Sequence, residues 1–438
     1  MSDDLKSGVL GSKDAEIKQL DLINSSGQPI DLKRSGQAIE LIIHQSIYDS
    51  CMYGTLLVSD AQDIFYNYHF CGNEFLQISI DKPTLGEPIE KIFRIYKVTD
   101  RRKGGNSAQT FIVHFCSIEL ILSKSIRVSK AYKGKAPTEI VNDILTNYLK
   151  VTDDKIARLE STNGKHNIII PNYHPFEAIQ WVASRAYSDS PKYCYYFFEN
   201  SRGYNFVSSQ TLYRGTGGYT KTIKFEVKNA EEPDAAVNRD SADKHTILND
   251  FDALTSTENA SYAAKLLNVD LFQQSYDYIK YSADTLRGQK LLLNEYLPIN
   301  DLKDVTGNTA VKAYDSYLAT YANINNVNNN DENYVDKWKI SRAQQMSLLN
   351  NFRIQVVVPG DTSMNAGDVV KVEFPKSVAP DEAGKESDDY RSGKYLVSSI
   401  KHKFVIADDT YECTAVLCSD SFAAQLPAAK DLIKGFGK

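Results

Sequence analysis

Short segments of alternating apolar and polar residues follow one another from Glu16 to about Ser125. Such alternation is the pattern of a strand with one buried face. It is clearest in Ala38–His44, Gly54–Ser59, Glu74–Ile80 and Ile92–Val98. Turn-forming residues separate the segments. Regularly spaced short strands without intervening helices predict an antiparallel β-barrel over residues 15–128.

The periodicity changes after Tyr132. Apolar residues at helical spacing follow Pro137, and a second helical pattern begins at Pro175, with proline in each case near the first turn. A strand at 167–170 lies between them, and a strand pair at 193–199 and 204–207 follows. Residues 129–215 are therefore predicted to form an α+β insertion domain.

The remaining chain is mixed before it returns to strands. Residues 216–345 contain strand-like segments and a short helix at 338–349, and we expect this peripheral region to contribute strands to a second barrel. Its Asn-rich part, 300–335, predicts a mobile surface excursion. Strand patterns then predict a second tube-type barrel at 346–422. Residues 1–14 are predicted to form a flexible arm, and residues 423–438 a C-terminal helix or tail.

The two β-rich regions share an order of elements. In the first, a strand opened by Gly72 and a strand from Ile92 precede a hairpin that ends in Cys116-Ser117. In the second, a strand opened by Gly367 and a strand from Tyr395 precede a hairpin that ends in Cys418-Ser419. Any two β-meanders share some of this pattern, but the matching closing Cys-Ser favours a duplication. We expect the two modules to lie side by side.

Several segments resemble a known family. The run Gly72–Ile80 is similar to a strand of the baseplate hub protein of T-even-type contractile phages. Lys133–Leu145 and Ile170–Ile179 resemble segments of hub proteins from many contractile tails. The resemblance extends to four further segments, 195–199, 203–208, 248–254 and 367–419. It covers roughly residues 15–425 and consists of pattern more than of invariant residues.

The resemblance implies a fold and a role. The fold class would be α+β and mainly β, with two related antiparallel tube-type β-barrels and α+β insertion domains. The chain would form a homotrimeric ring with pseudo-sixfold symmetry, which joins the hexameric tail tube or its initiator proteins to the trimeric central spike. Baseplate wedge proteins would be neighbours, and DNA would pass through the lumen without specific binding. The location would be the virion tail baseplate, assembled in the host cytoplasm.

Composition argues against two classes of protein, those that bind nucleic acid and those that insert into membranes. The net charge of -6 argues against a protein that grips nucleic-acid phosphates, because such proteins carry a basic excess. None of the six cysteines forms a C-x-x-C pair, so buried, reduced thiols are expected. No segment has the roughly 18 consecutive apolar residues of a membrane span, and no membrane insertion is expected.

The sequence contains no recognisable catalytic or ligand-binding motif. We therefore expect no catalytic residue, no cofactor-binding residue, no metal ligand and no cofactor. The motifs of zinc peptidases, serine hydrolases and phosphate loops are absent. No two of the seven histidines have metal-ligand spacing on one helix. The family is not enzymatic, and any lysozyme activity would belong to the spike partner.

Two other functions stay open at this stage. A tail-associated hydrolase is motivated only by the acid pairs Asp153-Asp154, Asp388-Asp389 and Asp408-Asp409. A receptor- or carbohydrate-binding tail protein is motivated by the 27 tyrosines, chiefly the group Tyr66, Tyr68 and Phe70 and the run 193–198. Packing in cores and interfaces is the simpler explanation for these aromatic residues.

Overall fold

The computed structural model describes thirteen stretches of the chain. They are residues 16–67, 70–81, 88–104, 108–188, 193–215, 220–224, 244–259, 261–270, 274–282, 292–297, 318–323, 334–374 and 388–424. The predicted arm at 1–14 and all but the start of the predicted tail at 423–438 lie outside them. Within these stretches, no helix is long and apolar enough to cross a membrane.

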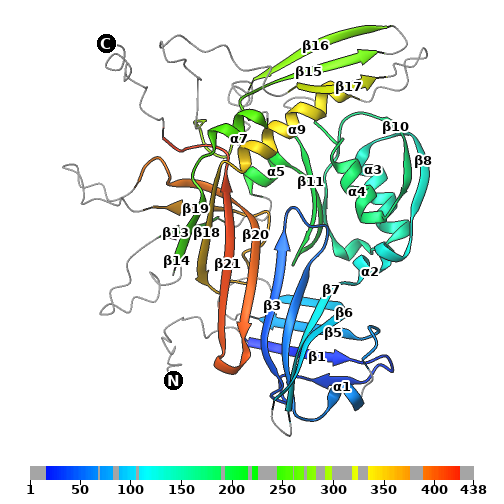
Figure 1. The fold of residues 1–438 in the computed structure, drawn as a ribbon, viewed down its shortest axis with the longest axis vertical. Helices are drawn as coiled ribbons and strands as arrows, with labels where there is room; N and C mark the ends of the chain where they lie inside the picture. The colour runs from blue at the N-terminus through cyan, green and yellow to red at the C-terminus, as the bar shows by residue number, and fades with distance from the viewer. Residues whose placement is uncertain are drawn as a thin grey trace, which may run out of the picture.

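A first set of antiparallel strands occupies the N-terminal quarter of the chain (Figure 1). Alternate side chains of these strands are buried, which is the result the sequence pattern predicts. Within the set, the strands are hydrogen-bonded in the order β3-β4-β7-β6-β5-β1-β2. The bounds are β1 Glu16–Ile23, β2 Pro29–Asp31, β3 Ala38–Ser46, β4 Tyr53–Asp60, β5 Phe75–Asp81, β6 Ile89–Gly104 and β7 Ala108–Ser117, with a short helix α1 at Ile64–Asn67.

A second set of strands is assembled from distant parts of the chain. Its long strands come from the C-terminal region, and two shorter ones come from the segment between the insertion and the Asn-rich region. The hydrogen-bonded order is β14-β18-β21-β20-β19-β13. The bounds are β13 Thr220–Lys224, β14 Lys244–Asn249, β18 Phe352–Pro359, β19 Val369–Glu373, β20 Gly393–Val405 and β21 Thr410–Ser419, with a 3-10 turn η3 at Ile406–Asp408.

The two sets repeat one topology. Reading β3-β4-β7-β6-β5-β1 against β14-β18-β21-β20-β19-β13 pairs each strand with an equivalent. Cys116 lies opposite Arg94, and Cys418 lies opposite Leu396. The next step along β6 and along β20 is a register shift, after Ile95 and after Val397. The terminal strands differ, because β1 is antiparallel to β5 whereas β13 is parallel to β19.

A buried carboxylate marks the same place in each repeat. Glu74 and Asp368 stand just before β5 and β19, and each is at most 1% exposed. The Glu74 carboxylate accepts a hydrogen bond from the amide of Cys71, three residues earlier, at 2.8 Å. The Asp368 carboxylate accepts one from the amide of Asn365, also three residues earlier, at 2.9 Å. Together with the shared strand order and shared bulge, this detail supports the predicted duplication.

The α+β insertion packs around its own core of buried residues, which include Ile140, Ile179 and Phe197. Helices α3 and α4 begin with Pro137 and Pro175. Glu139 accepts a hydrogen bond from the backbone amide of the residue before Pro137, and Glu177 accepts one from the residue before Pro175. The elements are α2 Ile118–Ser125, β8 Val128–Lys135, α3 Pro137–Asp143, η1 Ile144–Tyr148, η2 Asp153–Lys155, β9 Ile156–Leu159, β10 His166–Tyr173, α4 Pro175–Ala183, β11 Tyr195–Asn200, β12 Gly203–Ser208 and α5 Ser209–Arg214.

A separate three-stranded sheet lies beside a helix at the other end of the molecule (Figure 1). It consists of β15 Ala263–Asp270, β16 Ser275–Ser282 and β17 Leu318–Asn323, next to α7 Ala253–Glu258 and α9 Val335–Leu349. Strand β17 corrects one prediction. The segment 300–335 is not wholly an irregular excursion, because 318–323 pairs in parallel with β15.

The predicted fold class is confirmed: the protein is mainly β, with large antiparallel sheets and an α+β part. The two strand sets are joined, and a single apolar core runs through both of them.

Candidate functional site: the junction of the two strand sets

The junction is made by β20 of the second set and β3 of the first, so the two modules lie side by side as predicted. These strands pair antiparallel from Ser399–Ser46 to Val405–Glu40. The pairing turns two repeats into one 13-stranded sheet. An ion pair crosses the seam, with Lys403 Nζ 3.3 Å from a Glu40 carboxylate oxygen. Because it is partly exposed, that pair contributes little to stability.

His402 is buried in the middle of this seam, opposite Ile43. Its ring nitrogens lie 3.3 Å from Gln45 Nε2 and 2.9 Å from the Tyr411 hydroxyl. Burial lowers the pKa of His402 to about 4, and the nearby Asp361 carboxylate only partly opposes that shift. The imidazole is therefore neutral at physiological pH, and its protonation would place a charge inside the sheet.

The seam should consequently weaken in acid. A histidine whose pKa falls on folding binds its proton more readily in the unfolded chain, so its contribution is complete above about pH 6.5 and is lost as pH falls toward 4. At pH 5 the expected loss in unfolding free energy is about 2 kcal/mol. Urea unfolding at pH 7 and pH 5 measures it, with His402→Gln as the comparison. An equal loss in the variant would refute the assignment to His402.

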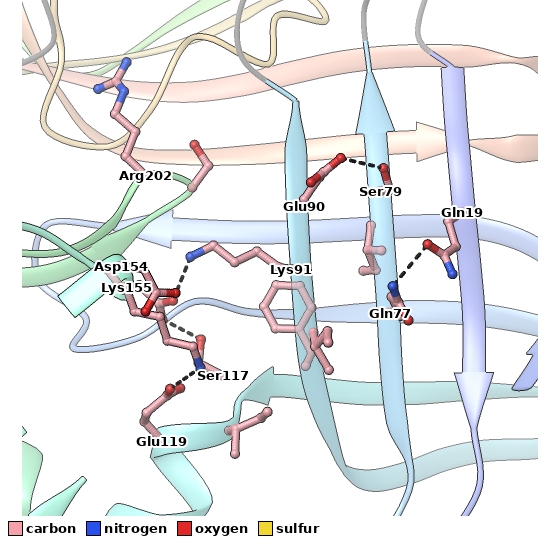
Figure 2. A pocket seen from close by; sticks show the side chains of 16 residues that line it. Gln19, Gln77, Ser79, Glu90, Lys91, Ser117, Glu119, Asp154, Lys155 and Arg202 are labelled. Atoms are coloured by element: carbon pink, nitrogen blue, oxygen red, sulfur yellow. Dashed lines mark hydrogen bonds and ion pairs between the residues drawn. The ribbon is translucent and has the colours of Figure 1, made fainter. Parts of the chain in front are cut away.

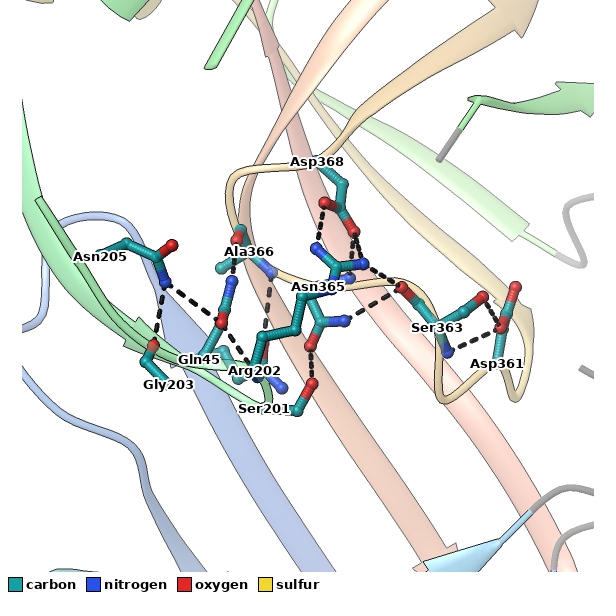
Figure 3. A network of polar contacts seen from close by, with 11 residues as sticks. Gln45, Ser201, Arg202, Gly203, Asn205, Asp361, Ser363, Asn365, Ala366 and Asp368 are labelled. Carbon is teal, nitrogen blue, oxygen red and sulfur yellow. Dashed lines mark hydrogen bonds and ion pairs between the residues drawn. The ribbon is translucent and has the colours of Figure 1, made fainter. Parts of the chain in front are cut away.

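A polar network attaches the insertion domain to this junction (Figure 3). Arg202, in the turn between β11 and β12, grips Asp368 through two nitrogens at 2.8 and 3.3 Å. The same guanidinium donates to the carbonyl of Ser363 at 3.1 Å. Gln45 of β3 accepts a hydrogen bond from the amide of Ala366 at 3.2 Å. One loop, residues 361–368, thus contacts both the first strand set and the insertion domain.

A cavity of about 540 Å³ lies between β5, β6, α2 and the same turn (Figure 2). Two ion pairs line it: Lys155 lies 2.7 Å from Glu119, and Lys91 lies 3.4 Å from the buried Glu199. Glu199 also accepts hydrogen bonds from the amide of Met52 and the hydroxyl of Ser117. Burial raises the pKa of Glu199 against the opposing effect of Lys91. Glu199 therefore ties the insertion domain to the first strand set.

The acid pairs singled out in the sequence do not come together in a cleft. Asp153 and Asp154 are exposed in η2, and Asp408 and Asp409 are exposed at the β20–β21 turn. Asp388 pairs with Arg391 at 3.0 Å, and Arg391 also pairs with Asp250. Among the described residues, no group of three or more His, Cys, Asp or Glu is placed to hold a metal ion.

The aromatic residues divide between core and surface. Tyr195, Tyr196, Phe197 and Phe198 are at most 3% exposed and pack in the cores, so this run is not a carbohydrate-stacking surface. Tyr66 is 70% exposed; Tyr68 lies outside the described residues. All six cysteines are free thiols, and five are buried. Cys71 is exposed and departs from the expectation of burial, because it lies in the turn before β5.

Sequence reasoning missed the residues that build the junction. Gln45, the neighbouring Glu199 and Arg202, and Asp368 lie in three distant parts of the chain, and nothing local marks them as partners. The available signal was indirect: an acid just after a strand-opening glycine, and a glutamate that ends the apolar run 193–198.

Comparisons with known proteins find the same architecture in solved structures of tail proteins. No family model matches the chain, and no curated protein matches its sequence. A tail protein from Neisseria meningitidis MC58 aligns with a TM-score of 0.53 at 11% identity, over 92% of this chain and 96% of its own. The 43 kDa tail protein of prophage MuSo2 from Shewanella oneidensis aligns with a TM-score of 0.51 at 11% identity, over 94% and 100%.

The chain has the fold of a phage tail protein. The alignments span nearly the full length of both partners, so the shared fold includes both strand sets and the insertion between them. At 11% identity the similarity is one of fold. This agrees with the sequence analysis, in which the resemblance consisted of pattern more than of invariant residues. The predicted similarity to phage tail proteins is confirmed at this level.

Proposed function

We propose that this tail-type protein is the baseplate hub of a contractile phage tail. In this proposal three copies form a ring that joins the hexameric tail tube to the trimeric central spike, beside tube-initiator and wedge proteins. The observation that carries the proposal is the repeated strand order, with the two repeats joined edge to edge by β20 and β3. Three such chains would present six similar wall units, and closed cyclic assemblies are the common form of homo-oligomers.

The chemistry of the described residues supports a structural role and no enzymatic one. The buried charged groups at the junction form ion pairs with each other, as in Arg202 with Asp368 and Lys91 with Glu199. A net charge of -6 suits a lumen through which DNA slides without binding, because adhesion to phosphates requires a basic surface. Free, mostly buried cysteines suit assembly in a reducing host cytoplasm before incorporation into the virion.

Oligomeric mass tests the proposal. Light scattering should show three copies of the 49.2 kDa chain, either as a trimer of the purified chain alone or within a complex whose mass also includes the spike partner. Electron-microscopic averages along the ring axis should show threefold symmetry with six similar lobes around an open centre. A chain that stays monomeric in the presence of the spike would refute the hub function, and so would clearing of peptidoglycan by the purified chain.

A further inference from the structure

The outermost strand of the three-stranded sheet is open to pairing along part of its length. Strand β16 pairs with β15 and with no other strand of the described residues, and it lies at the rim of that sheet (Figure 1). Its eight residues pair with the eight of β15 without a register shift. Over residues 275–279, the outer edge of β16 therefore offers a regular row of backbone N–H and C=O groups to another strand.

Strand β16 also lacks the features that usually prevent strand addition. Strand β8, another edge strand, carries Lys130, Lys133 and Lys135, and its pairing with β10 has two register shifts. Lysines and bulges of this kind keep other chains away from an edge. Strand β16 has no proline and no bulge, and it exposes Tyr276 at 67% and Tyr278 at 51%. A regular edge with exposed aromatic side chains is a template for pairing with another chain.

The side chains of β15 and β16 divide between two faces. Leu266 is buried and clusters with Ile340 of α9, so alternate residues face the helix and the others face away from it. On the side away from α9, the Tyr276 and Tyr278 rings lie 5.7 Å apart, and Lys265 Nζ lies 4.3 Å from the centre of the Tyr278 ring. This side, which we call the outer face, contains residues 265, 267, 269, 276, 278 and 280.

The outer face is basic. Lys265 of β15 lies directly opposite Lys280 of β16, and like charges in that arrangement repel each other and destabilise a sheet. The other four residues of the outer face are a leucine, a valine and two tyrosines, so the two strands place no carboxylate on it. A carboxylate supplied beside Lys280 would offset the repulsion. In a chain of net charge -6, this face is complementary to an acidic partner.

We propose that an extended, acidic segment of another protein adds to β16 as a fourth strand of this sheet. The open backbone edge selects an extended chain, because only another backbone supplies donors and acceptors at strand spacing. The two opposed lysines select a carboxylate opposite Lys280. The exposed rings of Tyr278 and Tyr276 select apolar side chains two and four residues further along the added strand, because alternate residues share a face.

Binding of synthetic peptides to the full-length chain tests the proposal. The peptide TETVTVT, antiparallel to β16, places its glutamate opposite Lys280 and its valines opposite Tyr278 and Tyr276. It should bind saturably at low salt and slow the hydrogen exchange of amides in residues 275–279. The lysine peptide TKTVTVT should bind roughly five- to tenfold more weakly. A fully N-methylated TETVTVT should not bind, because it has no backbone donors for the edge.

Two lysine variants locate the contact. Lys280→Glu should weaken the binding of TETVTVT roughly five- to tenfold and strengthen that of TKTVTVT by a similar factor, because the charge opposite the peptide changes sign. Lys133→Glu makes the same change on the edge strand β8 and should leave the binding of both peptides unchanged. Both lysines are exposed, so circular dichroism should show an intact fold in each variant.

Each other outcome contradicts a part of the proposal. Absence of saturable binding, or equal binding of the N-methylated peptide, would refute strand addition. Equal binding of TETVTVT and TKTVTVT would refute the acidic partner. Binding of dextran sulfate without binding of TETVTVT would show a surface for polyanions instead of a strand site.

The inference goes beyond the hub function and is separable from it, because the three-stranded sheet is not part of the 13-stranded sheet. A chain that stays monomeric with the spike present but binds TETVTVT through β16 would refute the hub function and leave this inference standing. A trimer that does not bind the peptide would do the reverse.

Discussion

Replacing Arg202 by alanine is expected to lower the free energy of unfolding by about 3–5 kcal/mol, because it leaves a buried carboxylate without its partner. Asp368 is 1% exposed, and the guanidinium of Arg202 holds it through two hydrogen bonds. Burial already raises the pKa of Asp368, against the effect of Arg202. Removing the cation also deletes its hydrogen bond to the Ser363 carbonyl and so weakens the attachment of the loop 361–368 to the insertion domain. Urea or thermal unfolding measures the loss.

Three comparison variants make the result specific to the pair. Arg202→Lys keeps the charge but not the two-pronged geometry and should lie between wild type and alanine. Arg202→Ala with Asp368→Asn should recover part of the loss, because no charge is then buried alone. Arg94→Ala removes a cation of the first strand set, where Arg94 of β6 bonds Asn73 in an exposed hydrogen bond, and should cost less than about 1 kcal/mol. Equal losses for Arg94→Ala and Arg202→Ala would refute the explanation.

Gly54→Ala is expected to cost about 3 kcal/mol or more, because there is no room for a methyl group at this position in the middle of the sheet. Gly54 lies between Ile43 on β3 and Phe115 on β7. An added Cβ would stand 2.1 Å from the carbonyl oxygen of Ile42 and 2.5 Å from the Phe115 ring. Phe115 is fully buried, and Ile42 lies on the strand that forms the seam, so relief would disturb the pairing with β20.

The same substitution at Gly104 is the control. A Cβ there would meet its nearest neighbour, the Ala108 carbonyl, at 3.6 Å, which is ordinary contact, so Gly104→Ala should change stability by less than about 1 kcal/mol. Chemical unfolding compares the two variants with the wild type, and light scattering checks assembly. A Gly54→Ala protein as stable as the Gly104→Ala protein would show that the strands relax around the extra carbon.

Much of the local structure could be predicted from the sequence, because it depends on residues that are close together in the chain. Alternating apolar residues in 38–44 and 74–80 became β3 and β5, and the prolines at 137 and 175 became helix starts. The closing Cys-Ser of each hairpin lies at the same register position in both repeats. In contrast, β14 was not predicted as a strand, because its side chains do not alternate between a buried and an exposed face.

What the sequence by itself determined is the set of strands and helices, their repetition and the absence of familiar catalytic motifs. Each of these follows from periodicity, turn residues and local spacing. Only the tertiary structure decided that β20 joins β3 and that Arg202 reaches Asp368. Strand edges present the same backbone donors and acceptors whatever their side chains, so partners more than 300 residues apart are selected by packing of the whole chain. For the same reason, only the fold shows that β16 has no second strand partner within the described part of the chain.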